Sequence, residues 1–164
     1  MAGVVMANDE GIWFAGLRTQ GVVDFVPGNH FVEGPDLGYS NYDFGSHRLQ
    51  FHAAYLTNRP EQLFRKNLLK IDYYLFSPEY HFGRNSFFDL LLKMDLGYYH
   101  YTIPNPIFDV LDNSSWIATP KVGLGLNLKQ GQYGIDYHLG YNLIVPQSGF
   151  VYPLVFEIGI WMVL

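Results

Sequence analysis

Histidines and carboxylates are the side chains of this chain most able to do chemistry, and their spacing tests for a catalytic or metal site. The six histidines are His30, His47, His52, His81, His100 and His138. No two of them follow the H-x-H or HExxH spacing that brings two imidazoles to one metal ion. There is no G-x-S-x-G elbow to expose a nucleophilic serine, and cysteine is absent. The sequence therefore predicts no catalytic residue, no cofactor and no metal.

One short segment resembles a catalytic strand. Residues 131–138, Gly-Gln-Tyr-Gly-Ile-Asp-Tyr-His, followed by Asn142, are similar to the strand that carries a His-x-Ser-Asn segment in outer-membrane lipid A deacylases. Here Gly140 stands where that family has its nucleophilic serine, and the asparagine is displaced by one position. Without a hydroxyl, acyl transfer by that route has no nucleophile for His138 to activate. The resemblance implies a shared barrel architecture, and a lipid-modifying hydrolase is kept as an alternative function.

A second set of ionisable residues alternates with apolar residues along the chain. It consists of Arg48, His52, Lys70, Asp72, Lys93, Asp95, Lys121, Asp136, His138 and Glu157. A strand places alternate residues on opposite sides, so such alternation puts these groups on one face of a sheet and apolar groups on the other.

The elements that must position these residues are therefore strands. In the closing segment, 150–164, one face carries Tyr152, Leu154, Phe156, Ile158, Ile160, Met162 and Leu164. The same pattern is found in 11–17, 46–57, 69–82, 89–102, 116–128 and 132–145. An eighth strand is expected at 21–32, where Pro27 and Gly28 interrupt the pattern, since bacterial outer-membrane barrels have an even number of strands. The predicted fold is all-β, an antiparallel up-and-down transmembrane β-barrel of eight strands.

The polar face then lines the lumen. An eight-stranded barrel is just wide enough for side chains to fill it, and charges in a low-dielectric interior have to pair. We therefore expect an ion-paired plug, with a proton or ion path through Asp95, Asp136 and His138 as the alternative. In 69–82 this interpretation assigns Lys70, Asp72, Tyr74 and Phe76 to the lumen, and it assigns Leu69, Ile71, Tyr73 and Leu75 to the lipid.

A soluble barrel of lipocalin type, with its apolar face turned inward around a hydrophobic ligand, shows the same alternation. Charged residues make up only 15% of this chain, and the polar face combines isolated charges with glycines, which suits a narrow interior better than a solvated exterior. No run reaches the roughly 18 apolar residues of a spanning helix. The net charge of −5 and the absence of a basic stripe exclude nucleic acid as a partner.

Connections and aromatic residues carry the remaining expectations. Segments 83–86 and 129–131 are short turns, whereas 57–67 and 102–115 are long and are expected outside the cell. The apolar residues of the second long segment are a candidate partner-binding loop or a cover over the barrel mouth: Pro104, Pro106, Ile107, Phe108, Val110 and Leu111. Segment 27–46 is a further candidate binding loop. An aromatic girdle at the membrane interfaces is expected from Trp13, Tyr98, Tyr101, Trp116, Tyr133, Tyr141, Tyr152 and Trp161.

Residues 1–7 match the tail of a signal peptide, with Val5-x-Ala7 as its small-residue cleavage site; a start added for expression is the alternative. Residues 8–164 are expected to form a single barrel domain. The expected location is the bacterial outer membrane, and the expected role is that of a non-enzymatic structural, adhesion or accessory subunit. Its expected partners are outer-membrane lipid and other subunits of a membrane complex.

Overall fold

The computed structural model describes residues 11–23, 30–44, 47–58, 70–83, 87–102, 113–144 and 154–164. The strands are β1 (Ile12–Val23), β2 (His30–Phe44), β3 (His47–Thr57), β4 (Lys70–Phe82), β5 (Phe88–Thr102), β6 (Asn113–Leu128), β7 (Tyr133–Tyr141), β8 (Leu143–Ile144) and β9 (Leu154–Val163). A 3₁₀ turn, η2 (Lys129–Gly131), joins β6 to β7. Among the residues described, no helix is long and apolar enough to cross a membrane.

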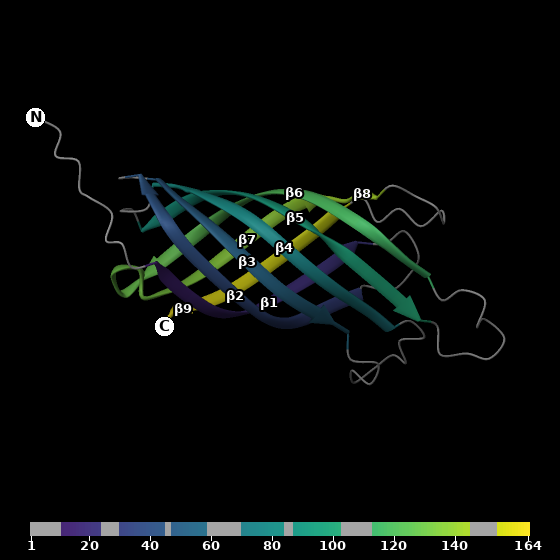
Figure 1. Cartoon of the computed structure of the whole chain (residues 1–164). Coiled ribbons are helices and arrows are strands. Elements are labelled where there is room, and N and C mark those ends of the chain that lie inside the picture. The colour runs from purple at the N-terminus through teal and green to yellow at the C-terminus, as the bar shows by residue number, and fades with distance from the viewer. Residues whose placement is uncertain are drawn as a thin grey trace, which may run out of the picture.

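The strands form one antiparallel sheet that closes on itself (Figure 1). Neighbours follow the order β5-β4-β3-β2-β1-β9-β7-β6, and β6 pairs with β5 to complete the ring. β8 has two residues, Leu143 and Ile144, which pair with Ala118 and Ile117 of β6 just beyond the end of β7. β7 and β8 therefore form one interrupted strand of the barrel beside β6. The result is an eight-stranded up-and-down barrel, which confirms the fold predicted from the alternation.

The position of the second strand was predicted wrongly. β1 continues past Leu17 to Val23, and β2 runs from His30 to Phe44, so the expected strand at 21–32 is divided between two strands. Pro27 and Gly28 stand in the sequence between the two strands, outside the described residues. Most of the segment 27–46, expected to be a binding loop, is therefore strand.

Glycine explains why β2 is hard to recognise as a strand. A Cβ placed on Gly34 would collide with the backbone oxygen of Tyr55 in β3, so this position requires glycine for the two strands to pair closely. The register also shifts between Tyr39 and Tyr42, where β2 carries an irregularity. Both features break the alternation of apolar and polar residues that identified the other strands.

The two ends of the barrel differ. At the short-turn end, the segments between strands are 45–46, 83–87 and 129–132. At the long-connection end they are 24–29, 58–69, 103–112 and 145–153. The C-terminal strand finishes at the short-turn end, where the Leu164 amide donates a hydrogen bond to the Trp13 carbonyl. Membrane barrels of this type have short periplasmic turns and longer external loops, so the long-connection end corresponds to the outer side.

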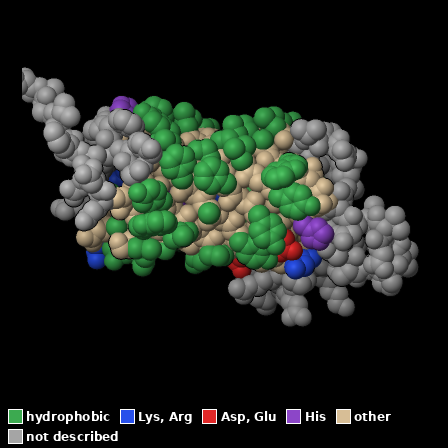
Figure 2. Space-filling view, in the orientation of Figure 1, with side chains coloured by type: hydrophobic (Ala, Val, Ile, Leu, Met, Phe, Trp, Pro, Cys, Tyr) green, Lys and Arg blue, Asp and Glu red, His purple; other side chains and the backbone are tan. Residues whose placement is uncertain are grey.

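Apolar side chains cover the outside of the barrel (Figure 2). Leu17 of β1, Tyr74 of β4, Phe88 of β5, Trp116 of β6 and Ile160 of β9 each expose more than half of their surface, and their strands lie on both sides of the ring. The interior holds the buried charged residues instead. The lipocalin-like arrangement, with the apolar face inward, is therefore wrong for this chain.

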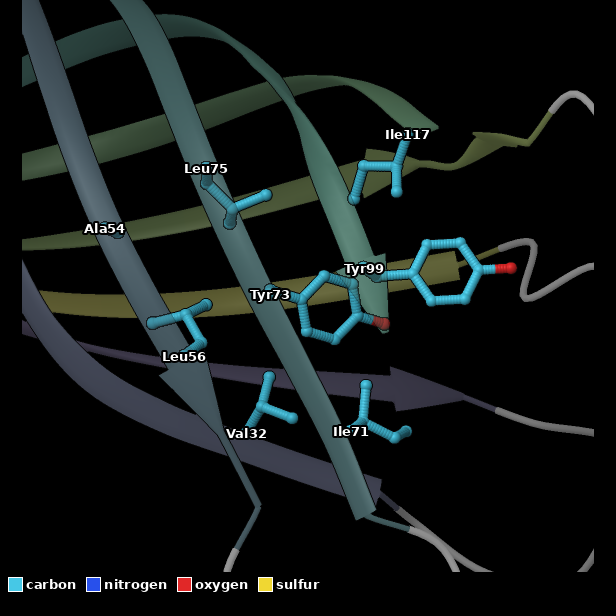
Figure 3. Packing of buried hydrophobic residues seen from close by; sticks show 8 residues of the cluster. All are labelled: Val32, Ala54, Leu56, Ile71, Tyr73, Leu75, Tyr99 and Ile117. Atoms are coloured by element: carbon cyan, nitrogen blue, oxygen red, sulfur yellow. The ribbon is translucent and has the colours of Figure 1, made fainter. Parts of the chain in front are cut away.

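An apolar cluster nevertheless fills one part of the lumen. Its members are Val32, Ala54, Leu56, Ile71, Tyr73, Leu75, Tyr99 and Ile117, all buried (Figure 3). These residues belong to the ends of β2–β6 that lie toward the long connections. The lumen is thus apolar toward the outer side and polar in its middle.

This cluster reverses the faces predicted for segment 69–82. Ile71, Tyr73 and Leu75 point into the lumen, whereas Tyr74 and Phe76 are exposed on the outer face. The reason lies further along β4, where Glu79 and His81 share the phase of Ile71 and have to enter the polar interior. Because both faces of residues 73–76 are apolar or aromatic, local alternation could not reveal the phase.

Candidate functional site: the ion-paired lumen

Arg18 of β1 is the centre of the polar interior. Its guanidinium lies 2.9 Å from Asp36 Oδ2 on β2, 3.4 Å from Asp95 Oδ1 on β5 and 3.6 Å from Glu157 Oε1 on β9. The same group donates a hydrogen bond to Ser77 Oγ at 3.3 Å. One fully buried cation therefore connects strands from opposite sides of the ring, which a guanidinium can do because it has five donors in a fixed plane.

Two lysines complete the cationic part of the network. Lys93 Nζ lies 2.8 Å from Glu157 Oε1 and 3.2 Å from Glu79 Oε2. Lys121 Nζ lies 2.5 Å from Asp95 Oδ2, and it also contacts Glu157 and the Gln20 side-chain oxygen. Each lysine thus contacts two carboxylates, and a charge in a low-dielectric interior requires such oppositely charged partners.

Three buried histidines each contact at least one carboxylate. His138 Nε2 is 3.5 Å from Glu79 Oε2, and its Nδ1 is 3.5 Å from Glu157 Oε1. His81 similarly lies 2.8 Å from Glu79 Oε1 and 3.3 Å from Asp89 Oδ2. His52 contacts Asp36 at 3.2 Å and Gln50 at 3.1 Å. The histidines extend the network from the middle of the barrel toward the short-turn end.

Most of the predicted lumen residues do lie inside. His52, Lys93, Asp95, Lys121, Asp136, His138 and Glu157 are buried in the interior. Arg48 is partly buried near the short-turn end, with its guanidinium 5.5 Å from the centre of the Phe14 ring. Asp136 is inward as well, between Gly125 and Gly159 in the register of its two neighbours.

Lys70 and Asp72 are placed differently from the prediction. They lie on the outer face of β4, at the rim of the long-connection end, where Lys70 Nζ is 3.1 Å from Asp72 Oδ2 and half exposed. The Tyr55 hydroxyl donates to Asp72 Oδ1 at 2.8 Å. This correction has the same cause as the reversed faces of β4: the phase is set by Glu79 and His81 further along the strand.

Several members of the network were not predicted. Arg18 and Gln20 were missed because the first apolar run was ended at Leu17, one residue before the arginine. Glu79 was missed because the phase predicted for 69–82 put Ile71 and every second residue after it, Glu79 included, on the lipid face. The alternation of the strand could have identified both residues. Arg18 lies on the same strand face as the buried Phe14, and Glu79 lies on the same face as the buried Ser77. Asp36 was missed together with the rest of β2.

The network consists of buried ion pairs and hydrogen bonds between side chains of several strands. Among the described residues, no group of three or more His, Asp or Glu is arranged to hold a metal ion. His138 is 1% exposed and faces the lumen, away from lipid. Gly140 stands at the position that carries serine in lipid A deacylases, so this position has no hydroxyl here. A Cβ added to Gly140 would meet atoms of Lys121, Pro120 and Thr119.

The residues proposed for a proton path join the network through different partners. Asp95 contacts Arg18, Lys121 and Ser77, whereas His138 contacts Glu79 and Glu157. On the side of β2–β6, the described interior toward the long-connection end is occupied by the apolar cluster of Figure 3. On the other side the buried Thr119 hydroxyl donates to Asn142 Oδ1 at 2.5 Å, so polar groups continue there without an ion pair between them.

Most of the described members of the expected aromatic girdle are exposed on the outer face. Trp13 and Tyr133 lie toward the short-turn end, and Tyr98, Trp116 and Tyr141 lie toward the other. Trp161 was assigned wrongly, because it is buried in the lumen with its ring perpendicular to that of Phe14, 5.6 Å between centres. Its indole occupies the space that a Cβ on Gly134 would need. The Tyr101 side chain, Tyr152, the candidate partner-binding loop at 104–111 and residues 1–7 lie outside what the structure describes.

No protein-family model matches the sequence, and no curated protein matches it either. Solved structures match in fold. The N-terminal β-barrel domain of Pseudomonas aeruginosa OprF gives a TM-score of 0.64 at 11% identity, covering 94% of this chain and 100% of that one. Neisserial surface protein A gives 0.58 at 14% identity, with 93% and 96% covered. Ail, the attachment invasion locus protein of Yersinia pestis, gives 0.57 at 15% identity, with 94% and 97% covered.

These similarities show that the chain has the fold of the small eight-stranded barrels of bacterial outer membranes. The exposed apolar surface is an independent observation on this chain, and it matches the outward-facing apolar band of such barrels.

Proposed function

We propose that this chain is a non-enzymatic barrel of the bacterial outer membrane that acts at its outer end, as an adhesion, structural or accessory subunit. The observation that carries this proposal is the filling of the described part of the lumen by side chains. An ion-paired layer around Arg18 fills the middle of the described barrel, and an apolar layer that includes Leu56 and Tyr73 fills the part toward the long connections. Neither layer provides an aqueous channel, in keeping with the narrow interior of an eight-stranded barrel.

The distribution of connecting segments supports a role at the outer end. All four long connections leave the barrel on that side, and binding residues are commonly presented by loops on a rigid scaffold. Of the structurally similar proteins, one is called a surface protein and another an attachment invasion locus protein. The apolar segment 104–111 is our candidate for the contact with a partner, because apolar residues in an outward-facing connection favour docking.

Affinity purification of the full chain from native membranes tests this proposal. A variant in which residues 104–111 are replaced by Gly and Ser is compared with one in which 60–67, in another long connection, are replaced in the same way. We expect a partner that is lost only with the first variant, while both variants keep the heat-modifiable gel migration of a folded barrel. Stepwise ion conductance by the purified protein in planar bilayers would contradict a closed barrel. Binding that persists without 104–111 would contradict the assignment of that segment.

A further inference from the structure

An apolar groove crosses the outer surface of the barrel on β2–β6. It has a volume of about 1040 Å³ and is open to the surroundings. The small residues Ala53 and Gly97 form its floor. Its walls include two aromatic pairs: the rings of Tyr55 and Tyr74 are 5.2 Å apart between centres, and those of Tyr98 and Trp116 are 5.7 Å apart. On a lipid-facing surface, a groove of this kind takes an acyl chain.

The groove ends at a polar cluster on the same outer face. Tyr55, in the groove wall, donates its hydroxyl hydrogen to Asp72, which in turn holds the Lys70 ammonium at 3.1 Å. Lys70 is half exposed, and an ammonium has three donors, so it can bind a further acceptor beside Asp72. In Figure 2, basic, acidic and histidine side chains gather near the right-hand end of the face, beside an otherwise hydrophobic surface.

The cluster lies at the end of the barrel, on the outward-facing side of β4. Lys70 and Asp72 lie at the start of β4, on the long-connection end, and the groove continues from them toward the middle of the barrel through Tyr74 and Phe76. Tyrosine and tryptophan prefer this interfacial level, and a lysine there attracts anionic lipid. Asp72 is buried and already bonded by Tyr55, so its role is to position Lys70.

We propose that this face is a binding site for an anionic, phosphate-bearing lipid of the outer-side leaflet. One acyl chain lies in the groove over Ala53, and the phosphate accepts hydrogen bonds from Lys70. The site is separate from the lumen network and does not depend on the role of the connecting segments.

Trp116 provides the readout, because it lines the groove and exposes 74% of its surface. The chain has three tryptophans, and Trp161 is buried in the lumen, so a Trp13→Phe background leaves Trp116 as the lipid-exposed one. The full chain is reconstituted into phosphatidylcholine vesicles that contain a fixed fraction of lipid brominated in its acyl chains. We expect brominated phosphatidylglycerol to quench Trp116 with about fivefold higher apparent affinity than brominated phosphatidylcholine.

Matched variants separate the site from general surface charge. Lys70→Gln should abolish the preference and Lys70→Arg should keep it. Lys129→Gln, at an exposed lysine of the short-turn end, should have no effect. Ala53→Phe should fill the groove and remove the preference, whereas Ala15→Phe, on the outer face of β1, should not. Equal quenching by the two lipids overturns the proposal. A preference that survives either Lys70→Gln or Ala53→Phe also overturns it, and gel migration shows that each variant is folded.

Discussion

Lys93 and Glu157 meet inside the barrel, with the ammonium 2.8 Å from the carboxylate oxygen, although their strands, β5 and β9, are not neighbours in the sheet. Main-chain hydrogen bonds connect only adjacent strands. This ion pair therefore links walls of the barrel that the backbone ladder does not join directly. Lys93 also contacts Glu79 of β4, so a single side chain connects three strands.

Removing Lys93 should destabilise the barrel strongly. In Lys93→Met, Glu79 and Glu157 lose a buried counter-charge, and the free energy of unfolding should fall by about 3–5 kcal/mol. Urea unfolding in lipid vesicles, followed by tryptophan fluorescence, measures the change. Lys129→Met, which removes an exposed lysine, should change the same quantity by less than about 0.5 kcal/mol. Adding Glu157→Gln to Lys93→Met should recover part of the loss, and no recovery would mean that the pair is not coupled.

Gly34 should not tolerate a side chain. A Cβ at this position meets the backbone oxygen of Tyr55, which cannot move without breaking the β2–β3 pairing, so Gly34→Ala should cost about 1–3 kcal/mol of unfolding free energy. Gly159→Ala is the control, because its Cβ would have only the Asp136 Cβ nearby, at 3.9 Å. Thermal unfolding in detergent, read by gel migration, compares the two. Equal stability of both variants would show that β2 and β3 are packed less closely than described.

The apolar cluster should behave as a packed core. Leu56 is fully buried in it, so Leu56→Ala should leave a cavity and destabilise the protein by about 2–5 kcal/mol. Leu124→Ala removes the same atoms from a side chain that is more than half exposed, where no cavity forms, and should cost clearly less. Denaturant titrations of both variants test this difference. If the two costs are alike, the outer part of the lumen is not tightly filled.

His138 should have no part in lipid hydrolysis. It is buried between Glu79 and Glu157, and the nearby Gly140 offers no nucleophile. Incubation of the purified protein with lipid A, followed by mass spectrometry, should show no released fatty acid for the parent chain or for His138→Ala. Fatty-acid release that the substitution abolishes would instead support an enzyme.

Sequence alternation predicted much of the barrel, because the side-chain period of a strand is short and repeats within each segment. Residues 132–145 and 154–164 show this clearly: Asp136, His138 and Glu157 were placed inside correctly, and their apolar neighbours outside. The prediction was wrong in 69–82, where Lys70 and Asp72 indicated the opposite phase and residues 73–76 are apolar or aromatic on both faces. The phase of this strand is fixed by Glu79 further along it, which lies in the lumen.

The polar and apolar periodicity along the chain was sufficient for the strand type, the closed barrel class and an apolar exterior, since these follow from local period and composition. The partners of each charge could not be obtained in this way. Arg18 meets Asp95 across 77 residues of sequence, and Lys121 meets Gln20 across 101. Such contacts arise only when the ring closes with a particular register, because closure brings distant strands into the same narrow lumen. Lys70 and Asp72 lie outward, at the rim of the groove, because Glu79 and His81 of the same strand occupy the polar lumen.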